Sequence, residues 1–129
     1  YEEYAAQLFE RFDLSDKTDK LGKELSRGMQ QKVSICCGVI TRPKVILLDE
    51  PMIGLDPKAI KELKNLFLEL KEQGCAVFIS THIIDTIRDI WDNILIMHQA
   101  KLVSNISRDE VEDDVDIEKR FFAVTGGLQ

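Results

Sequence analysis

KVILLDEP, at residues 44–51, is an unbroken apolar run that ends abruptly in two acidic residues and a proline. Successive apolar residues without polar alternation are typical of a strand that is buried on both faces, as in a parallel sheet covered by helices. We therefore expect a strand over Val45–Leu48 that delivers Asp49 and Glu50 to the surface. Asp49 is then suited to holding a metal ion, and Glu50 beside it to orienting a water molecule. The plainer interpretation is that a strand has reached solvent and turns at Pro51.

A second stretch, CAVFI at residues 75–79, has the same apolar character and ends at Ser80-Thr81-His82. Open α/β sheets bind ligands at the carboxyl ends of their strands, so both polar ends are expected to face one crevice. Between the two strands, Asp56 and Pro57 supply the N-cap and the first turn of a helix that Gly74 ends. The apolar face of this helix carries Ile60, Leu63, Leu66, Phe67 and Leu70.

The rest of the chain divides into further helices and strands by the periodicity of its apolar residues and by the residues that start and stop helices. The expected elements are a helix over Tyr1–Phe12, a loop at Ser15–Lys20, a helix from the N-cap Ser26 to Arg42-Pro43, a short helix over Ile83–Trp91, strands at Asn93–Met97 and Lys101–Ile106 joined by a tight turn, and a helix near Ile117–Val124. This alternation of strands and helices indicates a layered α/β fold.

The composition fits one modest domain with a hydrophobic core. The 129 residues are 44% hydrophobic and 31% charged, with a formal net charge of -6 and a pI near 4.9. Because this acidity gives no general basic footprint, nucleic acid is not expected as a partner. No apolar run approaches the roughly 20 residues that a membrane-spanning helix needs. Cys36, Cys37 and Cys75 lack metal-ligand spacing, and we expect Cys36 and Cys37 to be buried thiols in a reducing cytoplasm.

Four segments, in this order, resemble the motifs of ABC-type ATPases. LSRGMQQK at residues 25–32 resembles the signature sequence, Leu-Ser-Gly-Gly-Gln followed by Gln-Arg. VILLDEP at 45–51 resembles the Walker B strand with its catalytic glutamate. GLDP at 54–57 resembles the D-loop, and STH at 80–82 the switch histidine. Each motif alone is weak or moderate, whereas four in the right order and at plausible spacing are specific.

The resemblance covers nearly the whole chain and implies an α/β fold. This fold is a partial P-loop NTPase core of the ABC ATPase kind, with parallel-type strands and flanking helices, preceded by part of an α-helical subdomain. The resemblance assigns residues 1–43 to the helical signalling subdomain with the signature helix, and residues 44–129 to the C-terminal part of the catalytic core. Arg27 replaces a glycine and Met29 a glutamine of the usual signature, from which we expect altered detail rather than lost function.

The resemblance also implies roles for the polar residues at the strand ends. Asp49 would hold Mg²⁺, through water, and Glu50 would act as the general base or as a water-orienting group for attack on the γ-phosphate of ATP. His82 would contact that phosphate and respond to its presence. Phosphoryl transfer depends on positioning and on charge neutralisation, and these residue types supply both.

The predicted start of the signature helix is a second candidate site. Ser26 and Gly28 lie where free N–H groups and the helix dipole favour anions. By the resemblance, this surface, together with Gln31 and Asp56, contacts the ATP that a second subunit holds. Two ATP molecules would then be sandwiched between two domains in a head-to-tail dimer.

A phosphate-cradling loop needs Gly, four residues, and then Gly-Lys-Ser/Thr. The one Gly-Lys pair, Gly22-Lys23, is followed by Glu24, and the position five before Gly22 is Lys17. We therefore expect this loop, and the glutamine loop of the family, to precede Tyr1 in a longer chain. By itself the chain is expected to hydrolyse no ATP, and to expose sheet edge and apolar surface that favour self-association.

The resemblance implies a subunit of an ABC transporter that binds and hydrolyses ATP. This subunit would couple hydrolysis to transport through a transmembrane permease, at the cytoplasmic face of a bacterial membrane. A soluble ABC-type ATPase acting on DNA or ribosomes is the first alternative, which GLDP and the histidine after a strand disfavour. A non-catalytic interaction domain is the second, and the intact Glu50 and His82 argue against it.

Overall fold

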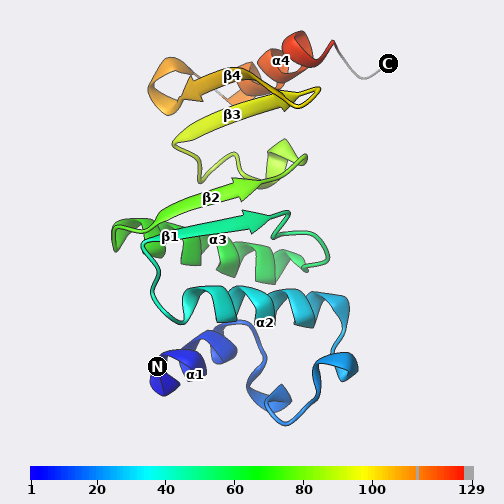
Figure 1. Cartoon of the computed structure of the whole chain (residues 1–129), viewed down its shortest axis with the longest axis vertical. Helices are drawn as coiled ribbons and strands as arrows, with labels where there is room; N and C mark the ends of the chain where they lie inside the picture. Colours follow the sequence, from blue (N-terminus) through cyan, green and yellow to red (C-terminus); the bar gives the residue numbers. More distant parts are fainter. Residues whose placement is uncertain (113, 127–129) are drawn as a thin grey trace. The chain divides into compact units, whose positions relative to one another are not determined.

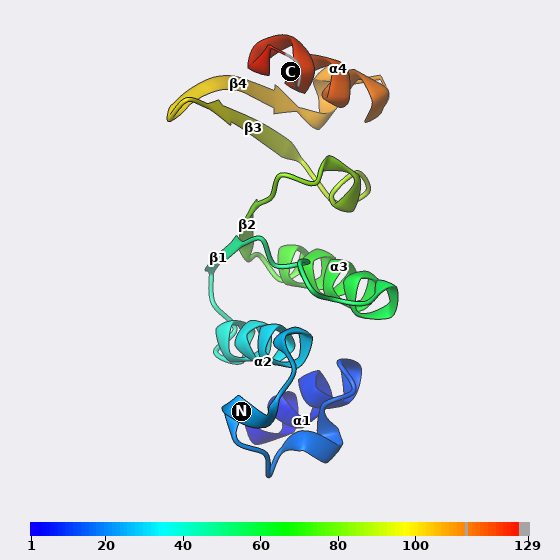
Figure 2. The same cartoon turned by 90° about the vertical axis from the view of Figure 1, so that its right-hand side faces the viewer.

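The chain folds into two compact units, Tyr1–His82 and Ile83–Gln129. Their elements are coloured along the chain in Figures 1 and 2. The structure, a computed structural model, describes residues 1–112 and 114–126. No helix among these residues is both long enough and apolar enough to cross a membrane.

The first unit combines three helices with a two-stranded parallel sheet. Its elements are α1 (Glu2–Arg11), α2 (Arg27–Val39), β1 (Val45–Asp49), α3 (Pro57–Glu72) and β2 (Ala76–Ser80), with short 3-10 turns at Ser15–Lys17 and Gly22–Glu24. Helices α2 and α3 both begin at the end of the sheet where β1 and β2 finish (Figure 1). The starts of two helices and the ends of two strands therefore share one side of this unit.

The starts of α2 and α3 follow from their capping residues, as predicted. Ser26 Oγ accepts the backbone N–H of Met29 at 3.2 Å and begins α2. Asp56 Oδ1 accepts the backbone N–H of Ala59 at 2.9 Å and begins α3, whose first residue is Pro57. These side chains satisfy N–H groups that a helix start leaves without intrahelical partners. Two of the predicted helices are thereby confirmed.

The expectation that the strands are buried on both faces is wrong. Ile46 is 7% exposed, whereas its neighbours Val45 and Leu47 are 61% and 73% exposed, and Phe78 of β2 is 51% exposed. Side chains alternate across a strand, and α3 lies against one side of the sheet (Figure 2). Within residues 1–82 no helix covers the other side, so alternate apolar side chains of both strands stay exposed.

The expectation of two buried thiols holds for one of the adjacent cysteines. Cys36 is buried and Cys37 is exposed, and both are free thiols. Consecutive residues of a helix point about 100° apart, so a helix with one apolar face cannot bury both. Burial raises the pKa of the Cys36 thiol to about 12.

The second unit is a hairpin covered by a helix. Its strands, β3 (Asn93–His98) and β4 (Lys101–Ser107), pair antiparallel, and α4 (Asp114–Thr125) follows them. Gln99 and Ala100 both have positive φ, 48° and 59°, as a two-residue hairpin turn of the type I′ kind requires. The core of this unit contains Trp91, Ile96, Ile106 and Ile117.

The predicted helix over Ile83–Trp91 is wrong, because a single 3-10 turn, Ile84–Thr86, forms there. The hydroxyl of Thr86 donates to the carbonyl of Ile83 at 2.7 Å. Such local side-chain bonds compete with helix propagation. The last helix also begins earlier than expected, at Asp114 rather than near Ile117.

Candidate functional site

The first group of candidate residues lies where β1 and β2 end. The parallel register places Asp49 opposite Ser80, and the Ser80 hydroxyl donates to the Asp49 carboxylate. The backbone N–H of Glu50 donates to the carbonyl of Ser80 at 2.9 Å. Glu50 has a φ of +46°, a left-handed conformation that non-glycine residues seldom adopt. A strained backbone at a strand end thus presents an acidic side chain.

Glu50 and His82 are brought together by their two strands. His82 Nδ1 lies 2.5 Å from Glu50 Oε1, and the backbone N–H of His82 donates to the same oxygen at 3.0 Å. The His82 side chain is 71% exposed and that of Glu50 is 28% exposed. The arrangement expected from the sequence, with both residues at one edge of the sheet, is therefore present.

The electrostatics of this pair favour the ionised form of Glu50. The hydrogen bond with the His82 ring is the main cause that holds the pKa of Glu50 below its ordinary value, and a hydrogen bond from Thr81 adds to it. Hydrogen bonds to the charged form of an acid favour that form. A group that accepts a proton must first be deprotonated, so Glu50 is in the state that a general base needs.

Asp49 offers one carboxylate, beside a hydroxyl, at the same edge. No cluster of three or more His, Cys, Asp or Glu side chains that could hold a metal ion occurs in residues 1–112 and 114–126. Mg²⁺ is commonly bound by one or two carboxylates, with waters and substrate phosphates filling its other positions. The donor set therefore fits Mg²⁺ held jointly with a phosphate ligand, and it does not fit a cage made by this chain alone.

The second group lies at the start of α2. Ser26 caps this helix, and a Cβ atom added to Gly28 would lie 2.7 Å from the carbonyl oxygen of Gly54. Only a glycine fits at so close an approach between two backbones. Gln31, one turn further along, donates through Nε2 to the carbonyl of Pro51 at 3.1 Å. The start of α2 is thus packed directly on the loop that follows Glu50.

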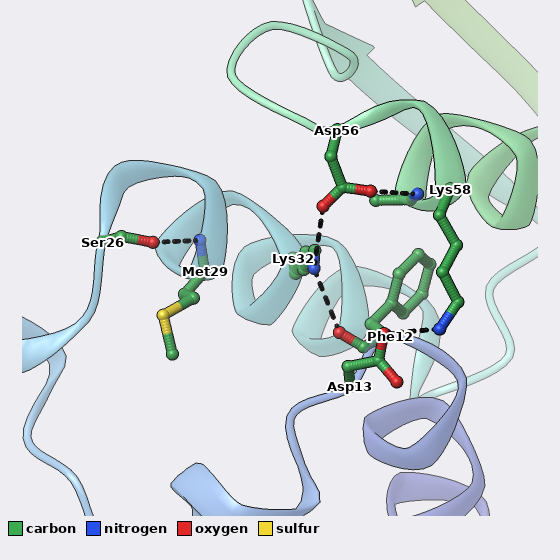
Figure 3. A network of polar contacts seen from close by, with 8 residues as sticks. Phe12, Asp13, Ser26, Met29, Lys32, Asp56 and Lys58 are labelled. Carbon is green, nitrogen blue, oxygen red and sulfur yellow. Dashed lines mark hydrogen bonds and ion pairs between the residues drawn. The ribbon is translucent and has the colours of Figure 1, made fainter.

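Asp56 closes that loop and belongs to a polar network (Figure 3). Besides capping α3, its carboxylate lies 3.8 Å from Lys32 Nζ through Oδ2. The backbone N–H of Ala59 is the main cause that lowers the pKa of Asp56, and the charge of Lys32 contributes. Of the four residues predicted to contact ATP across a dimer, Gly28, Gln31 and Asp56 lie at the contact between α2 and the loop, and Ser26 caps α2 two residues before Gly28.

Three partners of the site were missed from the sequence. Ser80 follows from the register, because a polar residue at the end of β2 has to face the end of β1. Gly54 and Lys32 stand inside the quoted motifs GLDP and LSRGMQQK, but nothing in the sequence indicated the close approach of the Gly54 carbonyl to Gly28 or the contact of Lys32 with Asp56.

Comparisons with known proteins agree on one family. A family model described as ABC transporter matches residues 1–53. The lipopolysaccharide export system ATP-binding protein LptB of Haemophilus influenzae is 31% identical over 117 residues, 91% of this chain and 48% of the relative. The bacitracin transport ATP-binding protein BcrA of Bacillus licheniformis is 36% identical over 107 residues, 82% of this chain and 35% of the relative.

A solved structure supports the same relationship. The structure of an ATP binding subunit of an ABC transporter matches with a TM-score of 0.81 and 31% identity, over 98% of this chain and 50% of the other. The chain therefore spans about half the length of this structure and of the Haemophilus relative, and about a third of the Bacillus relative.

Proposed function

We propose, from the premise that this chain belongs to the family of ABC transporter ATP-binding domains, that its whole protein hydrolyses ATP to drive transport. The α/β arrangement is that of part of the P-loop NTPase core of this family. The observation that carries the proposal is the pairing of Glu50 with His82 at the end of a parallel sheet. Lipopolysaccharide export and bacitracin transport are what two relatives are named for, and neither is assigned to this chain.

In the proposed mechanism, Glu50 accepts a proton from the water that attacks the γ-phosphate. Glu50 is a carboxylate at neutral pH, as an ordinary glutamate is, and its lowered pKa favours that form further. Its strained backbone donates to the carbonyl of Ser80 and accepts from the N–H of Ile53, which fixes where the carboxylate lies. His82 directs Nδ1 toward Glu50, so Nε2 is the nitrogen left for a phosphate oxygen, to which it donates as an imidazolium. Asp49 would hold Mg²⁺, whose charge offsets that of the phosphates when it is bound.

The start of α2 is proposed to serve a second nucleotide. Ser26 and Gly28 present helix N–H groups, a favourable place for a phosphate group. ATP held by another ATPase domain would dock there in a head-to-tail dimer, with Gln31 and Asp56 on the same surface. The dimer would act on a transmembrane permease at the cytoplasmic face of a bacterial membrane. We further propose that the chain alone hydrolyses no ATP, because it lacks a phosphate-cradling sequence.

The experiment that tests this proposal replaces Glu50 by Gln in the whole protein. We expect ATP hydrolysis to fall by about 10²- to 10⁴-fold, the typical contribution of a general base, because the amide cannot take the proton. ATP binding should persist, since no contact to the phosphates is removed. Steady-state ATPase assays and equilibrium binding of a fluorescent ATP analogue measure the two quantities.

Glu72→Gln is the matched control, because Glu72 is an exposed residue at the end of α3. This variant should hydrolyse ATP at the wild-type rate. A Glu50→Gln protein with unchanged turnover would remove the assignment of the base.

A further inference from the structure

The side chain of Lys32 joins three helices of the first unit. It projects from α2, is 13% exposed, and its Nζ lies 3.2 Å from the carbonyl oxygen of Phe12 and 3.8 Å from Asp56 Oδ2 (Figure 3). Phe12 is the C-cap of α1, and Asp56 is the N-cap of α3. One ammonium group therefore bridges the end of one helix and the beginning of another.

Both partners of Lys32 suit a cation for physical reasons. The last carbonyls of a helix lack intrahelical donors and carry partial negative charge, so the Phe12 carbonyl attracts an ammonium group. The Asp56 carboxylate uses Oδ1 for the N–H of Ala59, which leaves Oδ2 for Lys32. The Lys32 side chain is 13% exposed and that of Asp56 is 60% exposed, so solvent screens this pair in part, and less than it screens a pair with both groups exposed.

Neighbouring contacts of α2 fix the rest of the loop 51–56. Gln31 bonds the carbonyl of Pro51 at the beginning of the loop, and Gly28 abuts the carbonyl of Gly54 in its middle. Lys32 reaches Asp56 at its end. Helix α2 therefore touches the loop at its beginning, middle and end. Because the loop follows Glu50 directly, a shift of α2 displaces the segment attached to the proposed base.

We propose that Lys32 is a positioning residue that locks the loop 51–56 to α2 and to the end of α1. Through Asp56 it sets where the loop runs and thereby where the backbone of Glu50 is held. This role deepens the proposed ATP hydrolysis and rests on it for its functional consequence, although the structural lock itself does not require a nucleotide.

Lys58 provides a matched control within the same network. Its Nζ pairs with Asp13 at 2.8 Å, so it also ties α3 to the end of α1. The side chains of Lys58 and Asp13 are 71% and 63% exposed, and neither lies in the loop 51–56. Removing this pair therefore deletes a charge contact between the same two helices, while the contacts of Lys32, Gln31 and Gly28 with the loop stay in place.

The first arm of the test measures the lock without any nucleotide. Hydrogen–deuterium exchange of the segment 51–60 is followed in the whole protein for Lys32→Met, Lys32→Arg and Lys58→Met. We expect Lys32→Met to exchange about fivefold faster or more, because the opening of a local contact raises the exchange of its amides. Lys32→Arg should restore slow exchange, because its guanidinium can still reach both partners. Lys58→Met should match the wild type.

A second variant, Asp56→Asn, tests the same contact from the other side and keeps the proposal testable if a Lys32 variant fails to fold. Its side-chain oxygen still caps α3, but the charge that Lys32 meets is gone. Exchange in 51–60 should rise as it does for Lys32→Met. Unchanged exchange in both variants, or an equal rise for Lys58→Met, overturns the proposal.

The second arm measures ATP hydrolysis in the same proteins. Lys32→Met should lower kcat by about fivefold or more, with little change in KM for ATP, because misplacing a catalytic group slows the chemical step. Lys32→Arg should recover most of kcat. A loss of kcat that Lys58→Met reproduces would show a general structural effect and overturn the positioning role. If the wild type hydrolyses no ATP, the proposed function fails, while the exchange result still decides whether Lys32 locks the loop.

Discussion

The starts of α2 and α3 have the same capping geometry but differ in charge. Each helix begins at a capping side chain whose oxygen accepts the N–H three residues later, from Met29 at 3.2 Å and from Ala59 at 2.9 Å. The cap of α3, Asp56, is a carboxylate that also meets Lys32. The cap of α2, Ser26, is a neutral hydroxyl, and the first turn of that helix contains no acidic residue.

The start of α3 therefore has a negative charge of its own chain beside it, whereas the start of α2 has none and can receive the charge of a ligand. A negative charge near a helix N-terminus is stabilised by the helix dipole, and α3 already has one in Asp56. Helix α2 has the same dipole but supplies no carboxylate of its own to it. We therefore expect α3 to contribute to stability through its cap, and α2 to retain its capacity for a phosphate.

The largest expected effect tests how tightly α2 is seated on the loop. Gly28→Ala adds a Cβ atom 2.7 Å from the carbonyl oxygen of Gly54, a backbone atom that cannot move away easily. Alanine gains up to about 1 kcal/mol in helix propensity, but overpacking typically costs about 1–3 kcal/mol, so we expect a net loss in the free energy of unfolding. Chemical denaturation measures it. Gly22→Ala is the control, because nothing lies within 4 Å of its added Cβ; equal stability of the two variants would contradict the close seating.

A smaller effect separates the two caps. Ser26→Ala should lower the free energy of unfolding by about 1 kcal/mol, the usual loss of a neutral cap. Asp56→Ala should lower it further, because that variant also removes the charge at the helix start and the partner of Lys32. Paired denaturation curves at low salt give the comparison. If both variants lose the same free energy of unfolding, the charge of Asp56 makes no contribution to stability beyond that of a neutral cap.

The smallest effect is a pH dependence confined to the charged cap. The pKa of Asp56 is lowered, chiefly by the N–H of Ala59, so its carboxylate stabilises the folded chain above its ordinary pKa of about 4. That contribution is lost as the pH falls through the lowered pKa of the folded state. The difference in melting temperature between the wild type and Asp56→Asn should therefore shrink from about pH 7 to about pH 3. Because the carboxylate is exposed, added salt should reduce this difference as well; a constant difference across the range would contradict it.

Local signals predicted the elements that local physics determines. The caps at Ser26 and Asp56 and the stop at Gly74, whose φ is +86°, set helix ends through bonds within a few residues. The meeting of Glu50 with His82 also followed, since two parallel strands that end in polar residues present them at one edge.

The missed features depend on groups that are distant in the chain. Leu47 reads as buried because it belongs to an apolar run, but its exposure depends on which face of the sheet receives a helix. Lys32 reads as a solvated residue of α2, and its role arises only where α1 and α3 converge on it. Over Ile83–Trp91 the sequence interpretation rested on the apolar pattern, and the bond from the Thr86 hydroxyl to the carbonyl of Ile83, which competes with a helix, was not foreseen.

The unequal burial of adjacent cysteines gives α2 a built-in attachment point for a spectroscopic probe. Cys36 and Cys75 are shielded, and the high pKa of the Cys36 thiol leaves it almost entirely uncharged near neutral pH, whereas Cys37 is open to solvent. Thiol reagents act on accessible thiolates, so a maleimide dye should label Cys37 selectively without any engineered residue. A fluorophore there would sit on the helix that carries Gly28, Gln31 and Lys32 and would report its movements in real time.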